Sequence, residues 1–195
     1  MRHRLGCAAL FLGLASASCT DPTGTGLGRA EGMIQDSPTG APTVTGSLAG
    51  NMHVSLSADG LDWVDLGSPN GITVPLQLAG SATSVHGEVD APTGTYSRVR
   101  LVFDGVTARL QSGSTIEGTT LTADVNVLLG GSDGQVEVVI AVPAFTVEAE
   151  PQLQRTVVFE LRSTLWLTLA AAQAGTVLDA ALQGAILATT RVDPR

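Results

Sequence analysis

Hydrophobic and polar residues alternate with a period of two along most of this chain. In the clearest run, residues 96–103, three apolar side chains share one face, whereas Arg98 and Arg100 share the other. Such alternation is typical of a β-strand with one buried and one exposed face. Further alternating or short apolar runs predict strands at 30–35, 52–57, 63–66, 72–78, 85–89, 106–110, 121–129, 136–142, 157–161 and 180–188.

Glycine-containing turns between neighbouring runs predict three hairpins. An Asp-Gly dipeptide or a short glycine-rich loop between alternating runs is typical of this connection. The first predicted hairpin joins 96–103 to 106–110 through Asp104-Gly105, and the second joins 121–129 to 136–142 through 130–134. The third joins 52–57 to 63–66 through Asp59-Gly60. Pro75 predicts an edge position for the strand at 72–78, because proline cannot donate a hydrogen bond to a neighbouring strand.

Many short strands without a long amphipathic helix predict an all-β fold. We expect a single antiparallel β-sandwich with Greek-key-like topology over residues 29–192, with a small β-barrel as the alternative. Residues 165–169 are predicted to extend the strand at 157–161, and 169–174 allow one helical turn. Residues 180–188 are predicted as the closing strand, although their Ala and Leu content also permits a short helix.

Residues 1–19 have the pattern of an export signal peptide. Arginines near the start precede an apolar run at 5–14, which is too short to span a bilayer. Small residues then lead to Cys19 in a pattern that resembles a bacterial lipoprotein site. The Cys19 thiol would carry the lipid, and residues 20–28 would form a flexible tether to the domain.

The leader leaves two predicted locations open. Lipidation of Cys19 predicts a cell-envelope protein, and Thr20 in the second mature position favours the outer membrane. Cleavage after Ala17 would instead release a soluble secreted or periplasmic protein. Cys7 leaves with the leader in both cases, so the mature chain holds no intramolecular disulfide.

The charge of the chain is strongly acidic. It has no lysine, and two of its ten arginines lie in the leader. The remaining eight arginines and eighteen acidic residues give the mature chain a net charge of −10. This balance argues against nucleic acid as a partner and against electrostatic binding to anionic lipid.

Several segments resemble a known family. Trp63 after an Asp-Gly turn, the aliphatic run 72–78 and the sequence APTGTYSRVRLVF at 91–103 resemble an exported bacterial domain family of unknown function, numbered 4382. Residues 30–38 are similar to its opening strand, and 156–167 resemble its penultimate strand. The resemblance covers about 29–192 and implies a β-sandwich, often lipid-anchored, with no established catalytic residues.

Two aromatic residues and two arginines are the candidate ligand-binding residues. Tyr96 has the position of a tyrosine corner, with its ring in the core, or could stack on a sugar. Trp63 is expected as a core anchor, with a sugar platform as the alternative. Arg98 and Arg100 are expected to pair with acids such as Asp124, Glu137 or Glu160, or else to bind a carboxylate or phosphate. Trp166 lies opposite its leucine neighbours and is a candidate for partial exposure or for contact with residues 170–174.

Other polar residues give no pattern of a catalytic or metal site. Asp59, Asp62 and Asp65 lack the order of a calcium-binding loop, so we expect solvated turn acids. His53 and His86 are the histidines of the mature chain, and neither has a ligand at metal-binding spacing. No nucleophile elbow or phosphate-binding loop is present. We therefore expect no catalytic residues, no metal, no cofactor and no enzymatic activity.

These observations predict a lipid-anchored, extracytoplasmic β-sandwich with a structural or interaction role. Its expected partners are the membrane, through the lipid, and a glycan or an envelope protein. The alternative is a carbohydrate- or small-ligand-binding module that uses the loops around Trp63 and Tyr96. That alternative rests on analogy with other sandwich domains.

Overall fold

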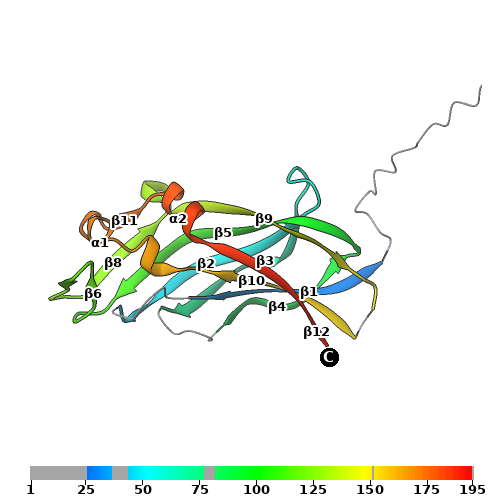
Figure 1. Cartoon of the computed structure of the whole chain (residues 1–195), viewed down its shortest axis with the longest axis horizontal. Helices are drawn as coiled ribbons and strands as arrows, with labels where there is room; N and C mark the ends of the chain where they lie inside the picture. Colours follow the sequence, from blue (N-terminus) through cyan, green and yellow to red (C-terminus); the bar gives the residue numbers. More distant parts are fainter. Residues whose placement is uncertain (1–25, 37–43, 77–81, 151, 195) are drawn as a thin grey trace, which may run out of the picture.

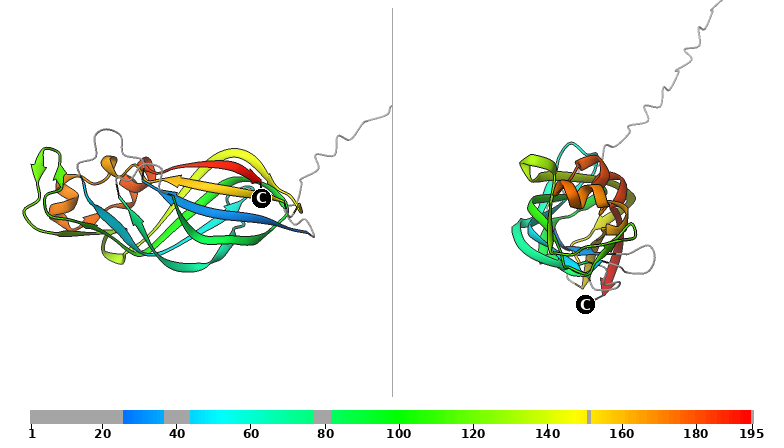
Figure 2. Two further views of the ribbon diagram at one scale, coloured as in Figure 1. Left: turned by 90° about the horizontal axis from the view of Figure 1, so that it is seen from below. Right: turned by 90° about the vertical axis from the view of Figure 1, so that its left-hand side faces the viewer.

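A computed structural model describes residues 26–36, 44–76, 82–150 and 152–194. These residues form two stacked β-sheets in an elongated molecule, with short helices gathered towards one end (Figures 1 and 2). The smaller sheet has the order β12-β10-β1-β4 and contains β1 (Leu27–Gln35), β4 (Thr83–Pro92), β10 (Leu153–Glu160) and β12 (Leu187–Pro194). The larger sheet has the order β11-β8-β5-β2-β3 and contains β2 (Gly46–Ser57), β3 (Val64–Pro75), β5 (Gly94–Leu110), β8 (Val125–Leu129) and β11 (Thr176–Val177), while β9 (Gln135–Val147) also pairs with β5.

The predicted all-β sandwich is confirmed. The chain crosses from one sheet to the other six times, between β1 and β2, β3 and β4, β4 and β5, β9 and β10, β10 and β11, and β11 and β12. In the described residues neither sheet closes on itself, so the small barrel does not form. The smaller sheet is mixed rather than purely antiparallel, because β1 pairs with β10 in parallel and with β4 in antiparallel orientation.

Aliphatic side chains from both sheets fill the space between them. The largest fully buried residues include Phe103, Phe159, Tyr96 and Trp166. The predicted partial exposure of Trp166 is wrong, since only 1% of its surface is accessible. Its indole N–H donates to the carbonyl of Leu161 at 2.9 Å, which satisfies the one polar group that a buried tryptophan brings into a core.

The predicted hairpin at Asp104-Gly105 is wrong, because β5 is one strand of seventeen residues. β2 runs beside both halves of it, and their register shifts between Ala49 and Asn51. Gly105 has a φ of 62° and forms a β-bulge. The extra residue moves the apolar positions from odd to even numbers, so both halves of β5 keep their apolar side chains in the core.

The second predicted hairpin is also wrong, because β8 and β9 lie end to end beside β5. Residues 107–110 of β5 pair with β8, and residues 94–104 pair with β9. The short η1 helix (Gly131–Asp133) joins the two strands at the level of the bulge. There the N–H of Gly105 donates to the carbonyl of Gly134 at 2.7 Å.

A third glycine completes this irregular level of the sheet. A side chain at Gly50 on β2 would place its Cβ 2.6 Å from Cα of Val106 and 2.8 Å from the carbonyl oxygen of Gly105. We call Gly50, Gly105 and Gly134 the glycine seam. The seam runs from β2 across β5 to the residue that precedes β9, and it divides the larger sheet into two halves.

The third strand confirms two predictions and corrects another. β3 lies at an edge of the larger sheet, as Pro75 predicted. Its antiparallel pairing with β2 confirms the hairpin predicted between 52–57 and 63–66. The predicted strands at 63–66 and 72–78 lie largely within this one strand, because β2 pairs with residues of both. Residues 77–78 of the second run lie outside the described residues.

Short helices replace the strands predicted near the end of the chain. Arg162, with a φ of 45°, turns the backbone into η2 (Ser163–Leu165), so β10 ends at Glu160. The predicted helical turn is confirmed as α1 (Leu169–Ala174), in which the N–H of Ala171 donates to the side chain of Thr168. Most of the predicted closing strand is α2 (Asp179–Ala185), the helix that its Ala and Leu content permitted, and β12 follows it.

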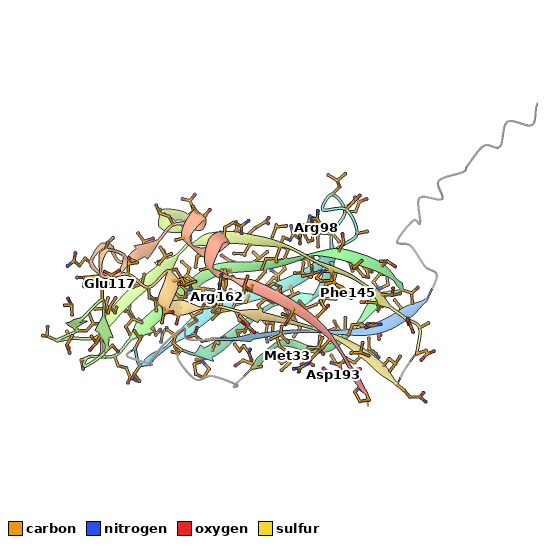
Figure 3. The ribbon with its side chains drawn as sticks, in the orientation of Figure 1. Met33, Arg98, Glu117, Phe145, Arg162 and Asp193 are labelled. Carbon is orange, nitrogen blue, oxygen red and sulfur yellow. The ribbon has the colours of Figure 1, made fainter. Side chains whose placement is uncertain are left out.

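Buried hydrogen bonds tie the first strand to the last part of the chain. The fully buried carboxylate of Asp36, directly after β1, accepts from the N–H of Ser163 at 2.9 Å and from its hydroxyl at 2.5 Å. The guanidinium of Arg162 donates to the carbonyls of Gly184 and Ala185 at the end of α2. These contacts fix η2 and α2 against the end of the smaller sheet (Figure 3).

The N-terminal end of the described domain lies at one end of the long axis. β1 begins at Leu27, so Leu27 and Gly28 belong to the sheet and not to the predicted tether. The carbonyl of Gly26 accepts from the N–H of Thr93 at 3.0 Å. α1, β8 and the β6–β7 hairpin (β6 Thr115–Ile116, β7 Thr119–Thr120) lie at the other end (Figure 1). Residues 1–25, with the predicted signal and Cys19, lie outside the described residues.

Candidate functional site

The structure brings together two of the four candidate residues, Trp63 and Arg100. The guanidinium carbon of Arg100 lies 4.6 Å from the ring centroid of Trp63, a cation–π contact. Trp63 is half-buried on the outer face of the larger sheet and is not part of the core. The core-anchor interpretation of Trp63 is therefore wrong, and one face of its ring is covered by Arg100.

Polar partners surround Arg100 on the same face. Its Nη2 atom lies 3.2 Å from the hydroxyl of Ser55 and 3.5 Å from Oδ1 of Asp65, and its Nη1 atom lies 3.4 Å from Oε1 of Glu137. The hydroxyl of Ser55 donates to Asp65 at 2.6 Å. The predicted pairing with Glu137 is confirmed. We call these five residues, Trp63 included, the Arg100 network. Two carboxylates and one hydroxyl contact the guanidinium, and the Arg100 side chain is 17% exposed.

Arg98 lies at the base of the loop between β2 and β3 (Figure 3). Its Nη1 atom donates to the carbonyl of Ser97 at 3.0 Å, and it forms no ion pair among the described residues. The hydroxyl of Ser97 donates to the carbonyl of Ala58 at 2.6 Å, which holds the loop against β5. Ser97 thus holds the loop, the Arg98 side chain donates to Ser97, and the predicted pairing with an acid is wrong for Arg98.

The aspartates of that loop and of the start of β3 do not form one cluster. Asp59 accepts from the N–H groups of Leu61 and Asp62, and these bonds lower the pKa of its exposed carboxyl. Asp65 belongs to the Arg100 network. In the part of the chain that the structure describes, no three His, Cys, Asp or Glu side chains are grouped to hold a metal ion.

Tyr96 is a core residue and not a ligand-binding one. It is 1% exposed, its ring centroid lies 5.9 Å from that of Phe145, and its hydroxyl donates to the carbonyl of Pro92 at 2.7 Å. Burial raises the pKa of the hydroxyl. The corner-like interpretation of Tyr96 is confirmed, and stacking on a sugar is excluded because no face of the ring is accessible.

His86 serves the backbone of the larger sheet. Its Nε2 atom accepts from the N–H of Val54 at 3.3 Å, where the register of β2 and β3 shifts. Gly67, with a φ of 78°, leaves room for the ring. Burial and the nearby His53 lower the pKa of His86, against the opposing effect of Asp65. Since an accepting nitrogen must be unprotonated, this site holds the neutral imidazole.

The best candidate site is a groove on the other half of the larger sheet. It has a volume of about 680 Å³ and lies where β2, β5 and β8 meet the end of α1. We call it the Arg109 groove. It is lined by Gly46, Ser47, Thr107, Arg109, Leu110, Gln111, Asp124, Asn126, Leu128 and Gly175.

The polar groups of the groove form a row across three strands. Ser47, Arg109 and Asn126 are paired neighbours on β2, β5 and β8. Oδ1 of Asp124 accepts from the N–H of Ser112 at 2.8 Å, which orients that carboxylate. Within the described ranges the side chain of Arg109 makes no hydrogen bond and no ion pair. The groove therefore combines a free cation, an oriented carboxylate, an amide and hydroxyls.

Sequence reasoning missed this groove. The alternation placed Arg109, Asp124 and Asn126 on exposed faces, but it could not show that β2 and β8 flank the same half of β5. The sequence carried no signal for it, because the runs 96–103 and 106–110 both lack acidic residues and so do not distinguish Arg109 from Arg100.

A second hollow, of about 450 Å³, lies between α1, β11 and α2. Its lining is almost entirely apolar: Leu165, Trp166, Ala170, Ala171, Ala174, Val177, Leu178 and Ala181, with Thr168 and Thr176. Two threonines offer few groups to orient a polar ligand. The Arg109 groove is therefore the better candidate for specific recognition.

Comparison with known proteins adds no assignment. No family model, curated protein or solved structure matches the chain. The resemblance to family 4382 stays a prediction. Among the described residues, no helix has the length and apolar character needed to cross a membrane.

Proposed function

We propose that this protein is an extracytoplasmic binding protein, held at the cell envelope by a lipid on Cys19, whose Arg109 groove binds a carbohydrate. The observation that carries the binding function is the groove itself. It presents side-chain donors and acceptors from Ser47, Arg109, Asp124 and Asn126 around a volume of about 680 Å³. Such a set suits a ligand that carries many hydroxyl groups, since each hydroxyl both donates and accepts.

The position of the groove supports this proposal. Cys19 precedes Gly26 by seven residues, so an extended chain holds that end of the domain within roughly 25 Å of a lipid at Cys19. The groove adjoins β8 and α1, which lie at the opposite end of the long axis (Figure 1). A lipid at Cys19 would thus leave the groove on the side of the domain that faces away from the membrane.

A glycan array with the full chain in detergent tests the binding function. We expect binding to a subset of glycans, and we expect Asn126→Ala to weaken it about fivefold to tenfold, as for one or two lost hydrogen bonds. Asn51→Ala, on an exposed position of β2 outside the groove, is the matched control and should bind as the natural chain does. A folded protein that binds no glycan would contradict carbohydrate binding and leave a structural or interaction role.

Metabolic labelling with a palmitate analogue tests the anchor. The natural chain should incorporate the label, and Cys19→Ala should not, because the thiol is the attachment atom. Equal labelling of the two chains would contradict the lipid anchor without touching the proposal for the groove.

A further inference from the structure

We infer that the Arg109 groove selects acidic carbohydrates, with Arg109 binding the carboxylate of a uronic-acid-type sugar. This inference rests on the proposed carbohydrate binding and narrows its ligand class. It starts from a comparison of the arginines in the described residues. Arg29, Arg100, Arg155 and Arg191 each have an acidic partner within 4.0 Å. Arg98 and Arg162 donate to backbone carbonyls, and Arg109 alone has no partner of either kind.

The neighbours of Arg109 are neutral although the chain is acidic. Ser47 and Asn126 flank it on the adjacent strands, whereas Arg100 has Ser55 beside it and Asp65 one strand further. Asp124 lines the same groove but forms no ion pair with Arg109 and is held by the N–H of Ser112. The N–H donors of the guanidinium therefore have no acceptor among the described residues and are available to a ligand.

The chemistry of the groove favours a carboxylate on a sugar. Guanidinium and carboxylate form two parallel hydrogen bonds, which fix orientation as well as charge. The hydroxyls of the same sugar can donate to Asp124 and accept from Asn126. A doubly charged phosphate is less suitable, because Asp124 and the net charge of −8 of the full chain both repel a second negative charge.

The array described above gives the first part of the test. Binding concentrated on glycans that contain uronic acids is the expected result. Binding of neutral glycans only would overturn the acidic preference and leave the proposed function standing. Binding of no glycan would overturn both.

Calorimetry on an acidic hit gives the second part. We expect the natural chain to bind the acidic glycan about tenfold to a hundredfold more tightly than its methyl ester, as for the loss of a charged, bidentate contact. Arg109→Gln should bind acid and ester equally, and Arg191→Gln, an exposed arginine of the other sheet, should keep the full preference. Raising the salt concentration should weaken binding of the acid and spare the ester.

The variants separate recognition from folding. Arg109 is exposed and its side chain has no hydrogen bond or ion pair in the described residues, so Arg109→Gln should unfold at the same temperature as the natural chain. An Arg109→Gln protein that still prefers the acid to the ester would overturn the assignment of Arg109. Inorganic phosphate, added as a competitor, should not displace the glycan; displacement would show a general anion site and overturn the carboxylate preference.

Discussion

The two halves of strand β5 each carry an arginine on the outer face of the sheet, and the structure surrounds the two differently. Arg100 lies over Trp63 and between two carboxylates, with its side chain 17% exposed. Arg109 lies exposed in a groove and has no partner among the described residues. The glycine seam separates these surroundings. A charged side chain that the protein leaves without an opposite charge, such as Arg109, is therefore the better indicator of a binding function.

The same comparison explains why the predicted ligand-binding residues were misleading. Trp63 and Arg100 have the side chains that sugar-binding sites use, yet each is the other's partner. An arginine beside acids on neighbouring strands contributes to cross-strand pairing. The residues of the Arg109 groove are of common types. They matter because the strands bring their side chains together while the side chain of Arg109 forms no hydrogen bond or ion pair with any of them.

The largest expected loss of stability comes from adding a side chain within the glycine seam. Gly50→Ala would place a Cβ 2.6 Å from the backbone of Val106, and backbone cannot move aside as a flexible side chain can. We expect a loss of about 2–4 kcal/mol in the free energy of unfolding, measured by chemical denaturation. Gly184→Ala in α2, where a Cβ meets open space, should be neutral or stabilising by up to about 1 kcal/mol. Similar values for both would mean that the seam is not tightly packed.

A smaller difference in the free energy of unfolding is expected between variants of Arg100 and Arg109. Arg100→Met removes the cation–π contact and leaves Asp65 and Glu137 unpaired, so we expect a loss of about 1–2 kcal/mol. Arg109→Met should change the free energy of unfolding by less than about 0.5 kcal/mol, as at other exposed sites without contacts. Thermal and chemical denaturation of the two variants measure the difference. If Arg109→Met proved the more destabilising, Arg109 would be a structural residue.

The smallest expected effect is a pH dependence of the free energy of unfolding. It comes from His86, whose side chain contacts β2 in the Arg100 half of the larger sheet. The pKa of His86 is lowered from its ordinary value of 6.5, so the unfolded chain binds the proton more readily than the folded one. The stabilisation is complete above pH 6.5 and is lost as the pH falls towards the lowered pKa. His86→Gln should flatten the dependence of unfolding free energy on pH in this window, whereas His53→Gln should leave most of it. If the free energy of unfolding of His86→Gln varied with pH as that of the natural chain does, another group would cause the dependence.

Alternation predicted the fold class because it records which face of each strand is buried. Tyr96 was also predictable, since its hydroxyl reaches only four residues back, to Pro92. Local patterns of this kind need no knowledge of which strands are neighbours.

The connections could not be predicted from alternation, for a physical reason. A bulge adds one residue to a strand and moves the apolar positions to the other parity, and a turn between two strands can do the same. Asp104-Gly105 therefore has the pattern of a hairpin while β5 continues straight through it. The Arg109 groove was out of reach for a related reason, because Ser47, Arg109 and Asn126 become neighbours only through pairings between distant segments.

The parallel pairing of β1 with β10 has a consequence for the order in which the molecule assembles. Glu31 and Gln154, hydrogen-bonded neighbours across this pair, are 123 positions apart, and Asp36 and Ser163 are 127 apart. Contacts this far apart in sequence form slowly, because a long loop must close before they can. A chain that emerges from its N-terminus keeps one edge of β1 unpaired until residues 153–160 are available. The smaller sheet is therefore the last part to be completed, and a truncated chain exposes that edge to other strands.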